Sequence, residues 1–483
     1  MHKQKKYKAA TPGVAWLLTN LQIESPYGRE ALKELQPAGS NAQILNNTLD
    51  ELSLTIALIR QNPDFIEKTD SIFKGLRNIG GSLNNLAQSL TPDETELLEI
   101  KNFAILLTGL SSFYNQSGLK LASIQFDDIQ PVITVLNPDS VIISSFHIHE
   151  AYSETLKQIR AEKKKLESAI LKETNQAAKD SLRKNRASLV QLEKAEEFNV
   201  RSTLGKQLQN WLPQLRNNAT MVGKLELLLA KAKLALSWPA CRPQILPGGS
   251  PIQVKEAINP QIVDILAQHG KTFTPVTIEI TKGATLVTGA NMGGKTVALM
   301  TIAMNAELAM LGFFVFAREF SIPPLDFIYL VAGDSQNQMS GLSSFGAEII
   351  RLNEFIAHSN SGKGLAVFDE FARSTNPYEG SRFVQALSEY LQQSASYGII
   401  ATHYDGISLQ GASCYQVTGL KNKHVTPPVT TDRSQVLSNI CDNMDYRLIK
   451  IEGSYEVPKD ALNIATMLET DPGFLNILKK YYS

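Results

Sequence analysis

The N-terminal part of the chain has the hydrophobic spacing of packed helices. From about Val14 to Ser123, apolar residues recur every three or four positions, which is the repeat of one face of an α-helix. Residues 132–149 contain a short apolar run followed by alternation, so a short strand and a buried helix turn both fit that segment. The clearest helical run is Leu45, Leu49, Leu52, Ile56 and Ile59.

A charged helical hairpin is predicted between about 151 and 198. Leucine and isoleucine keep helical spacing on both sides of a polar stretch at 173–180, where we expect the turn. Each limb of about 20 residues would reach roughly 30 Å. An apolar helical pattern resumes at 208–238, and the stretch 241–249, rich in proline and glycine, is the predicted domain boundary.

Beyond residue 249, short apolar runs alternate with helical stretches. Strands separated by helices are typical of a parallel sheet that is covered on both faces. The predicted fold class is therefore an α/β domain with a mostly parallel sheet, preceded by an all-α domain that carries the helical hairpin. After about residue 460, two short helical patterns predict a helix–turn–helix element for packing. The expected strands are 285–288, 313–316, 327–331, 365–368 and 399–402.

The cysteine content indicates a cellular compartment, whereas the net charge does not identify a binding partner. The 483 residues include 47 lysines and arginines and 47 aspartates and glutamates, so no overall positive charge indicates nucleic acid, although a local patch could bind it. The three cysteines are far apart and lack metal-site spacing, as expected in a reducing compartment. The basic N-terminus has no apolar core after it, and no stretch is long enough to span a bilayer. We therefore expect a cytoplasmic protein without a membrane partner.

A glycine-rich loop with the pattern G-x-x-x-x-G-K-T occupies residues 289–296. It follows a predicted strand and opens onto a helical stretch, which is the setting in which backbone N–H groups bind phosphates. In such a loop Lys295 reaches the β and γ phosphate oxygens, and the Thr296 hydroxyl coordinates Mg²⁺. A chance glycine-rich turn is the alternative, and the flanking strand and helix argue against it. The loop predicts a site for a nucleoside triphosphate and Mg²⁺.

Two carboxylates, Asp369 and Glu370, come directly after the apolar strand pattern at 365–368. This is a Walker B arrangement, in which Asp369 completes the Mg²⁺ shell with Thr296 and Glu370 orients the water that attacks the γ phosphate. An acidic pair after a strand is common by itself, but the phosphate loop favours a functional one. The two motifs together indicate an ATPase.

His403 stands at the end of the last predicted strand. Residues at the carboxyl edge of a parallel sheet face the ligand crevice, so His403 could sense the γ phosphate. A purely structural histidine is the alternative.

These residues resemble one family, the ATPases of MutS-type mismatch-repair proteins. The family loop T-G-x-N-M-G-G-K-[ST] matches residues 288–296, and the family's A-T-H-Y matches residues 401–404. Residues 369–380 are similar to the family element D-E-x-G-R-G-T-S-x-x-[DE]-G. Three motifs in this order make the resemblance specific. The chain departs from the last element at Ala372, Ser374, Asn376 and Pro377.

The resemblance implies a homodimer in which each nucleotide site needs two chains. Residues 340–345 are similar to the family segment S-x-x-S-T-F, which in the family reaches across the dimer to the partner's nucleotide. The implied catalytic residues are Glu370 and His403, the implied Mg²⁺ ligands are Thr296 and Asp369, and the cofactors are ATP and Mg²⁺. The implied nucleotide-binding residues are Gly289, Asn291, Met292, Gly293, Gly294, Lys295, Thr296, Ser343 and Ser344.

The resemblance extends into the helical part of the chain. Residues 25–30 and 225–236 are similar to the lever helices of the family's core, whereas no room is left before Val14 for the mismatch-reading and connector domains. The charged hairpin stands in place of the larger DNA clamp. The implied domains are a tail at 1–13, a helical lever-like domain at 14–240 with its arm at about 151–198, a P-loop ATPase domain of the ABC/MutS type at 241–459, and a helix–turn–helix element for packing or dimerisation at 460–483.

Two kinds of partner remain open for the arm. Mismatched or branched DNA is favoured by the lysines at 163–165 and by Arg183, Lys184 and Arg186, while the balanced charge and the missing mismatch-reading domain count against it. A protein client is the alternative, because some clamp-poor MutS-like proteins resemble reactivating partners of cobalamin-dependent aminomutases and are similar in size. In either case ATP binding would close the dimer and hydrolysis would reset it, as in a conformational switch.

Overall fold

The chain forms two compact units. In this computed structural model the described residues are 9–138, 148–289, 294–331, 344–404, 407, 411–421, 443–451, 461–468 and 470–481. One unit takes in the described parts of Met1–Leu21, Leu35–Ser53 and Lys231–Ser483, and the other those of Gln22–Glu34 and Leu54–Ala230.

This division differs from the boundary expected at 241–249, because two N-terminal segments belong with the sheets. Val14 and Leu17 lie in the same buried cluster as the sheet residues. The Glu307 carboxylate accepts hydrogen bonds from the backbone N–H groups of Ala10 and Thr11 and from the Thr11 hydroxyl. Helical periodicity shows that a segment has an apolar face and does not show what covers that face.

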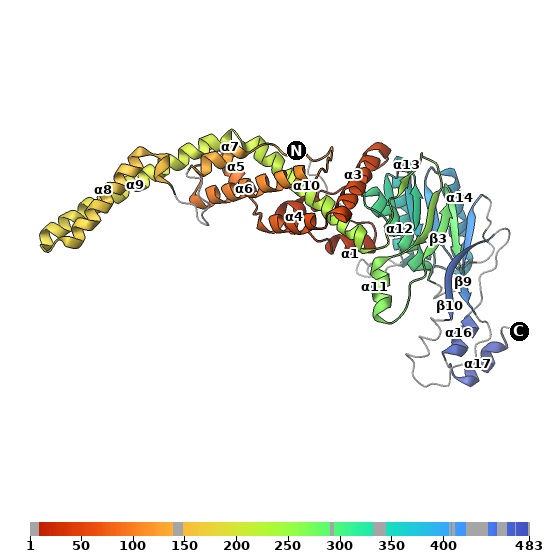
Figure 1. Ribbon diagram of the computed structural model, residues 1–483. Coiled ribbons are helices and arrows are strands. Elements are labelled where there is room, and N and C mark those ends of the chain that lie inside the picture. The colour runs from red at the N-terminus through yellow and green to blue at the C-terminus, as the bar shows by residue number, and fades with distance from the viewer. Residues whose placement is uncertain are drawn as a thin grey trace. The chain divides into compact units, whose positions relative to one another are not determined.

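The second unit is built of helices (Figure 1). Two helices are shared between the units, α3 (Ala42–Gln61) and α10 (Leu212–Ser237). No helix among the described residues is both long and apolar enough to cross a membrane. The remaining helices of this unit are α2 (Pro26–Lys33), α4 (Asp64–Gly75), α5 (Gly80–Ala87), α6 (Glu94–Gln116), α7 (Gln130–Leu136), the 3-10 helix η1 (Glu150–Tyr152), α8 (Glu154–Lys172) and α9 (Gln176–Gln209).

The predicted hairpin consists of α8 and α9. Side-chain oxygens of Ser153 and Asn175 accept backbone N–H groups in the first turns of these two helices, which fixes where each helix begins. The turn between the helices lies at residues 173–175, inside the expected range. In the segment left open at 132–149, residues up to Leu136 are helical, and residues 139–147 lie outside the described part of the chain.

The first unit contains two sheets. In the six-stranded sheet the order is β10-β9-β4-β8-β7-β6, and every pair is parallel except β10 with β9. The four-stranded sheet has the order β1-β5-β2-β3. The strands are β1 (Gln244–Ile245), β2 (Ile252–Ala257), β3 (Val276–Ile280), β4 (Gly283–Thr288), β5 (Glu319–Ile322), β6 (Phe327–Val331), β7 (Gly364–Phe368), β8 (Tyr397–Ala401), β9 (Ser413–Leu420) and β10 (Met444–Ile451). The helices are α1 (Pro12–Thr19), α11 (Pro260–Gln268), α12 (Lys295–Met310), α13 (Ser344–Ser361), α14 (Pro377–Gln393), α16 (Ala461–Met467) and α17 (Pro472–Lys479).

The strand predicted at 313–316 is wrong. Val315 forms only an isolated bridge with Cys241, and the neighbouring strand is β5, which follows at 319–322. Phe313, Val315 and Phe316 are buried in the core, so their apolar pattern reflects burial of a connecting segment. A short apolar run alone cannot distinguish the two cases.

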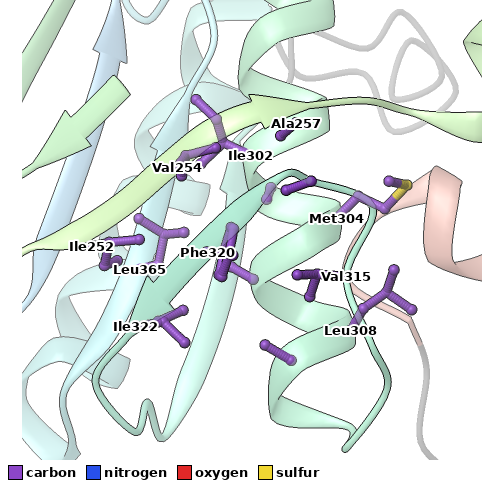
Figure 2. Packing of buried hydrophobic residues seen from close by; sticks show 14 of the residues in the cluster. Ile252, Val254, Ala257, Ile302, Met304, Leu308, Val315, Phe320, Ile322 and Leu365 are labelled. Atoms are coloured by element: carbon purple, nitrogen blue, oxygen red, sulfur yellow. The ribbon is translucent and has the colours of Figure 1, made fainter. Parts of the chain in front are cut away.

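Helices cover both faces of the six-stranded sheet. Leu365 and Val367 of β7 lie in one buried cluster, and Ala366 and Phe368 lie in the other, because successive strand residues point to opposite faces. The first cluster joins the sheet to α12 and to the smaller sheet, as the side chains of Ile302, Ile252 and Phe320 show in Figure 2. A sheet covered on both faces is why β4, β7 and β8 are buried along their whole length.

Candidate nucleotide-binding and catalytic site

The phosphate loop joins β4 to α12, as its flanking pattern predicts. Gly289 (φ 135°) and Gly294 (φ 81°) are both in backbone conformations that favour glycine, and α12 begins directly after Gly294. A Cβ on Gly294 would lie 2.8 Å from the ring of Tyr446. Lys295 is 4% exposed, and its Nζ donates a hydrogen bond to the Gly289 carbonyl at 2.7 Å. The other predicted loop residues, Asn291, Met292 and Gly293, lie outside the described residues.

The two acidic residues follow β7, two strands away from β4 in the sheet order. The Thr296 hydroxyl donates to Oδ2 of Asp369 at 2.8 Å, which joins the phosphate loop to the end of β7. The Asp369 N–H donates to the Val331 carbonyl of β6 at 2.9 Å. Glu370 comes next, and its carboxylate forms an ion pair with Arg373.

β8 lies between β4 and β7 and ends at the same edge of the sheet. The Thr402 N–H donates to the Val287 carbonyl at 3.0 Å, so the residues after β8 continue along β4. His403 is half-buried, and its ring centroid is 4.4 Å from that of Tyr404. The carboxyl ends of three neighbouring parallel strands thus bring Lys295, Asp369 and His403 to one edge, where open α/β sheets bind ligands.

Burial perturbs the titration of these groups. Burial lowers the pKa of Lys295, although the nearby carboxylates of Glu370 and Asp369 partly oppose the effect. Burial also raises the pKa of Asp369, against the hydrogen bond from Thr296. The pKa of His403 is lowered, again mainly by burial. An anion beside Lys295 and a cation beside Asp369 would each favour the charged form of its neighbour.

Asp369 offers a specific fit to a metal ion. Its Oδ1 atom is buried, and no donor among the described residues reaches it. A buried carboxylate oxygen without a donor is costly, and Mg²⁺ prefers oxygen ligands such as a carboxylate and a hydroxyl. Thr296 and Asp369 therefore suit the ion that accompanies a nucleoside triphosphate.

Ser343 and Ser344, the residues expected at the partner's nucleotide, are not placed at this edge. Ser343 lies outside the described residues, and Ser344 is the exposed first residue of α13. Their role across a dimer stays a prediction.

Sequence reasoning missed three contacts around Glu370. Arg373 pairs with the carboxylate itself, while Glu348 and Tyr404 hold the backbone that follows it. Arg373 lies three residues from Glu370 and could have been found from that spacing. Glu348 is 24 residues from its partner Ala372 on another element, and no local pattern connects them.

A phosphate loop between a strand and a helix, joined through its threonine to an acidic strand end, defines a P-loop ATPase-type domain. Comparison with known proteins makes the class more specific. Residues 285–466 match the family described as MutS domain V. The part of the chain from β4 to α16 is therefore similar to MutS domain V.

The similar proteins carry the name DNA mismatch repair protein MutS. The protein of Bacillus licheniformis is 28% identical over 233 residues, which are 47% of this chain and 26% of the relative. That of Bacillus cytotoxicus is 28% identical over 233 residues, 48% of this chain and 25% of the relative. That of Listeria monocytogenes is 26% identical over 231 residues, with shares of 48% and 26%. The chain thus spans about a quarter of the length of the curated relatives it matches.

Proposed function

We propose that the chain binds ATP with Mg²⁺ and hydrolyses it, and that the nucleotide cycle drives a conformational change in a homodimer. The observation that carries this proposal is the 2.8 Å hydrogen bond between Thr296 and Asp369. It brings the hydroxyl of the phosphate loop and the carboxylate of the acidic pair to one point, where the two oxygens would hold the Mg²⁺ that accompanies ATP.

Each residue of the site has a separate role in this proposal. Lys295 leaves the Gly289 carbonyl and contacts the β and γ phosphates. Glu370 orients the attacking water and accepts its proton, while His403 contacts the γ phosphate as a neutral imidazole. When bound through Thr296 and Asp369, Mg²⁺ neutralises phosphate charge. These roles use residues of one chain, and Ser343 and Ser344 would act on the nucleotide of a second copy.

Loss of the lysine tests the nucleotide site directly. Lys295→Ala is expected to weaken ATP binding at least about tenfold, because a buried cation facing the phosphates is removed. Equilibrium titration with a fluorescent ATP analogue measures the effect, and Lys282→Ala, at an exposed lysine just before β4, is the control. Equal affinities of the parent and Lys295→Ala would contradict the site.

We propose mismatched or branched DNA as the partner of the α8–α9 arm. Residues 160–190 include nine lysines and arginines and four acidic residues, so the distal arm is basic although the whole chain is neutral. Phosphate contacts supply most of the affinity of such a surface for DNA. The relatives' name, DNA mismatch repair protein, supports the same assignment.

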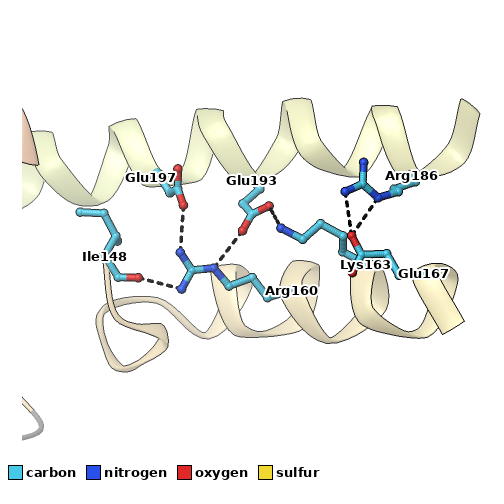
Figure 3. Close-up of polar contacts among 7 residues, drawn as sticks. All are labelled: Ile148, Arg160, Lys163, Glu167, Arg186, Glu193 and Glu197. Atoms are coloured by element: carbon cyan, nitrogen blue, oxygen red, sulfur yellow. Dashed lines mark hydrogen bonds and ion pairs between the residues drawn. The ribbon is translucent and has the colours of Figure 1, made fainter. Parts of the chain in front are cut away.

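Contacts within the arm favour the alternative, a protein client. Lys163 is paired with Glu193 and Arg186 with Glu167 (Figure 3). Arg183 is paired with Asp180, so half of the basic residues expected to contact DNA have acidic neighbours. Lys164, Lys165 and Lys184 are exposed on the same arm. An ATP-dependent remodelling factor for another enzyme would need fewer lysine and arginine side chains without acidic neighbours than a protein that grips DNA.

Binding to DNA across a salt series separates the two candidates. If the arm binds DNA, the logarithm of the affinity falls linearly with the logarithm of the salt concentration, and replacing Lys164, Lys165 and Lys184 by glutamine reduces the slope by roughly 2 to 3. Lys206→Gln, at the base of α9, is the matched control. Absence of binding to duplex, mismatched and four-way DNA at low salt would eliminate DNA as the partner.

A further inference from the structure

The loop after β7 carries two residues in left-handed backbone conformations. Glu370 has φ 50° and Ala372 has φ 61°, and neither is glycine. A Cβ disfavours this conformation, so it persists only where neighbouring groups hold it. At position 372 the MutS-type element quoted above has glycine, and this chain has alanine.

Glu348 of α13 holds the loop from one side. Its Oε2 accepts the Ala372 N–H at 2.7 Å, and its Oε1 accepts the Ser374 hydroxyl at 2.7 Å. Both carboxylate oxygens are therefore used on one short segment. Charge-assisted hydrogen bonds of this kind are stronger than bonds between neutral groups.

Tyr404 holds the same residue from the other side. Its hydroxyl donates to the Ala372 carbonyl at 2.8 Å, and its N–H donates to the Thr402 hydroxyl at 3.1 Å. Gly380 leaves the space for this contact, because a Cβ there would collide with the Tyr404 hydroxyl and lie 2.8 Å from the Ala372 carbonyl oxygen. Ala372 is fully buried, so both of its backbone polar groups need these partners.

Glu370 lies between two fixed points. On its N-terminal side the Asp369 N–H is bonded to the Val331 carbonyl, and on its C-terminal side Ala372 is bonded at both N–H and carbonyl. Between them the Phe371 ring packs edge to face on Phe368, with centroids 5.7 Å apart. The backbone direction of Glu370, and with it the position of its carboxylate, follows from these contacts.

We propose that Glu348 and Tyr404 are positioning residues for ATP hydrolysis, which act by clamping Ala372 and thereby directing the Glu370 carboxylate toward the γ phosphate. This inference rests on the proposed hydrolysis of ATP at the same site. The two residues do not touch the nucleotide. They place the group that orients the attacking water, and displacement of such a group by about 1 Å can lower a rate by about a hundredfold.

Two substitutions of nearly unchanged size remove the clamp. Glu348→Gln loses one of the two acceptors and presents an N–H₂ group to a donor, and Tyr404→Phe removes the hydroxyl that reaches the Ala372 carbonyl. We expect kcat for ATP to fall about tenfold to hundredfold in Glu348→Gln and about threefold to tenfold in Tyr404→Phe. The equilibrium Kd for ATP should change by less than about twofold in both, because the phosphate loop is untouched.

Glu354→Gln is the matched control. It makes the same replacement on the same helix, at a carboxylate that accepts the Tyr329 hydroxyl of β6 at 2.6 Å. Its kcat should stay within about twofold of the parent value. Equal losses of kcat in Glu348→Gln and Glu354→Gln would show that α13 is only a structural support and would overturn the clamp.

A double variant separates positioning from a general loss of stability. If Glu348 acts only through Glu370, adding Glu348→Gln to Glu370→Ala lowers the residual turnover no further, since effects of residues that act as a unit are not additive. Multiplicative losses in the double variant would overturn the proposal. If Glu370→Ala hydrolysed ATP at the parental rate, the proposed catalytic carboxylate would be wrong. If Glu370→Ala lost hydrolysis while Glu348→Gln kept the parental rate, only the proposed positioning role of Glu348 would be refuted.

Discussion

Lys231 is a buried lysine of α10. Its side chain contacts the C-terminal end of α12, the helix that begins at the phosphate loop. Lys231 is 5% exposed, and its amine donates to the Leu311 carbonyl at 2.8 Å. The amine also lies 4.3 Å from the centroid of the Phe313 ring. Burial lowers its pKa from 10.5 to about 7. A residue of α10 thereby satisfies a carbonyl that the end of α12 leaves open.

The low pKa of Lys231 predicts a pH-dependent stability. Between about pH 7 and 10.5 the unfolded chain holds the proton and the folded chain does not, so the free energy of unfolding should rise with pH in this window. The slope from this group is at most about 1.4 kcal/mol per pH unit. Below about pH 7 the buried amine is charged in the folded chain, and the free energy of unfolding is lowered by the full cost of burying that charge.

Chemical denaturation of Lys231→Met between pH 6 and 10 measures this contribution. Methionine keeps the length of the side chain and removes the titrating amine, so the rise that the parent shows from pH 7 upward should be absent. Lys224→Met, at an exposed position of the same helix, should keep it. Parallel pH profiles for the parent and Lys231→Met would contradict the assignment.

At the scale of elements, the α8–α9 arm is held together by a partly buried ionic network. Arg160 donates to Glu193 and to Glu197, each at 2.9 Å, and to the Ile148 carbonyl at 2.7 Å (Figure 3). Glu193 also binds Lys163. Burial alone would raise the pKa of Glu193, but the bonds from Lys163 and Arg160 lower it below its usual value. The stabilisation of the arm by Glu193 is therefore present above the ordinary carboxylate pKa and is lost as pH falls through the lowered one.

Removal of Arg160 should destabilise the arm more than removal of Arg186. Arg160→Ala removes the arginine partner of Glu197 and leaves Glu193 with Lys163 alone, at an expected cost of about 1–3 kcal/mol. The Arg186–Glu167 pair is more than 40% exposed and should contribute about 1 kcal/mol or less. Hydrogen exchange of the α8 and α9 amides measures both changes. Equal protection in the two variants would contradict the greater weight of the Arg160 network.

The sequence predicted contiguous features better than contacts between distant segments. The strand and helix on either side of the phosphate loop, the acidic pair after β7 and the two limbs of the arm depend on short spacings, and each lies at the expected position. The strand at 313–316 failed because buried connections and strands share an apolar pattern. Glu348 was missed because its contact with Ala372 depends on α13 lying beside the loop, which no spacing encodes. The placement of Val14 with the sheets depends on a contact between Thr11 and Glu307, 296 residues apart.

At the scale of the whole molecule, the proposed switch needs two copies of the chain. α17 has a face that suits such an interface, because Phe474 and Ile477 lie three residues apart on the helix and are 56% and 55% exposed. Tyr481, two residues beyond the end of the helix, is 83% exposed. Large exposed apolar side chains in one row often mark a protein contact. The dimerisation role expected for residues 460–483 stays a prediction.

Charge on that face should dissociate the dimer. The double substitution Phe474→Asp and Ile477→Asp places two carboxylates where apolar surface would be buried, and we expect the dimer Kd to rise at least about a hundredfold. Sedimentation equilibrium measures the change, and Lys479→Asp, an exposed position of the same helix, is the control. If the parent is a monomer with and without nucleotide, the proposed roles of Ser343 and Ser344 across the dimer fail.

The central claim is that Lys295, Thr296, Asp369 and Glu370 form one ATP-hydrolysing site. Single-turnover hydrolysis by Glu370→Ala, measured beside equilibrium ATP binding to the same sample, tests it most directly. The account predicts ATP binding within about threefold of the parent and hydrolysis slower by about a hundredfold or more, because only the group that orients the water is removed. Hydrolysis at the parental rate would contradict it.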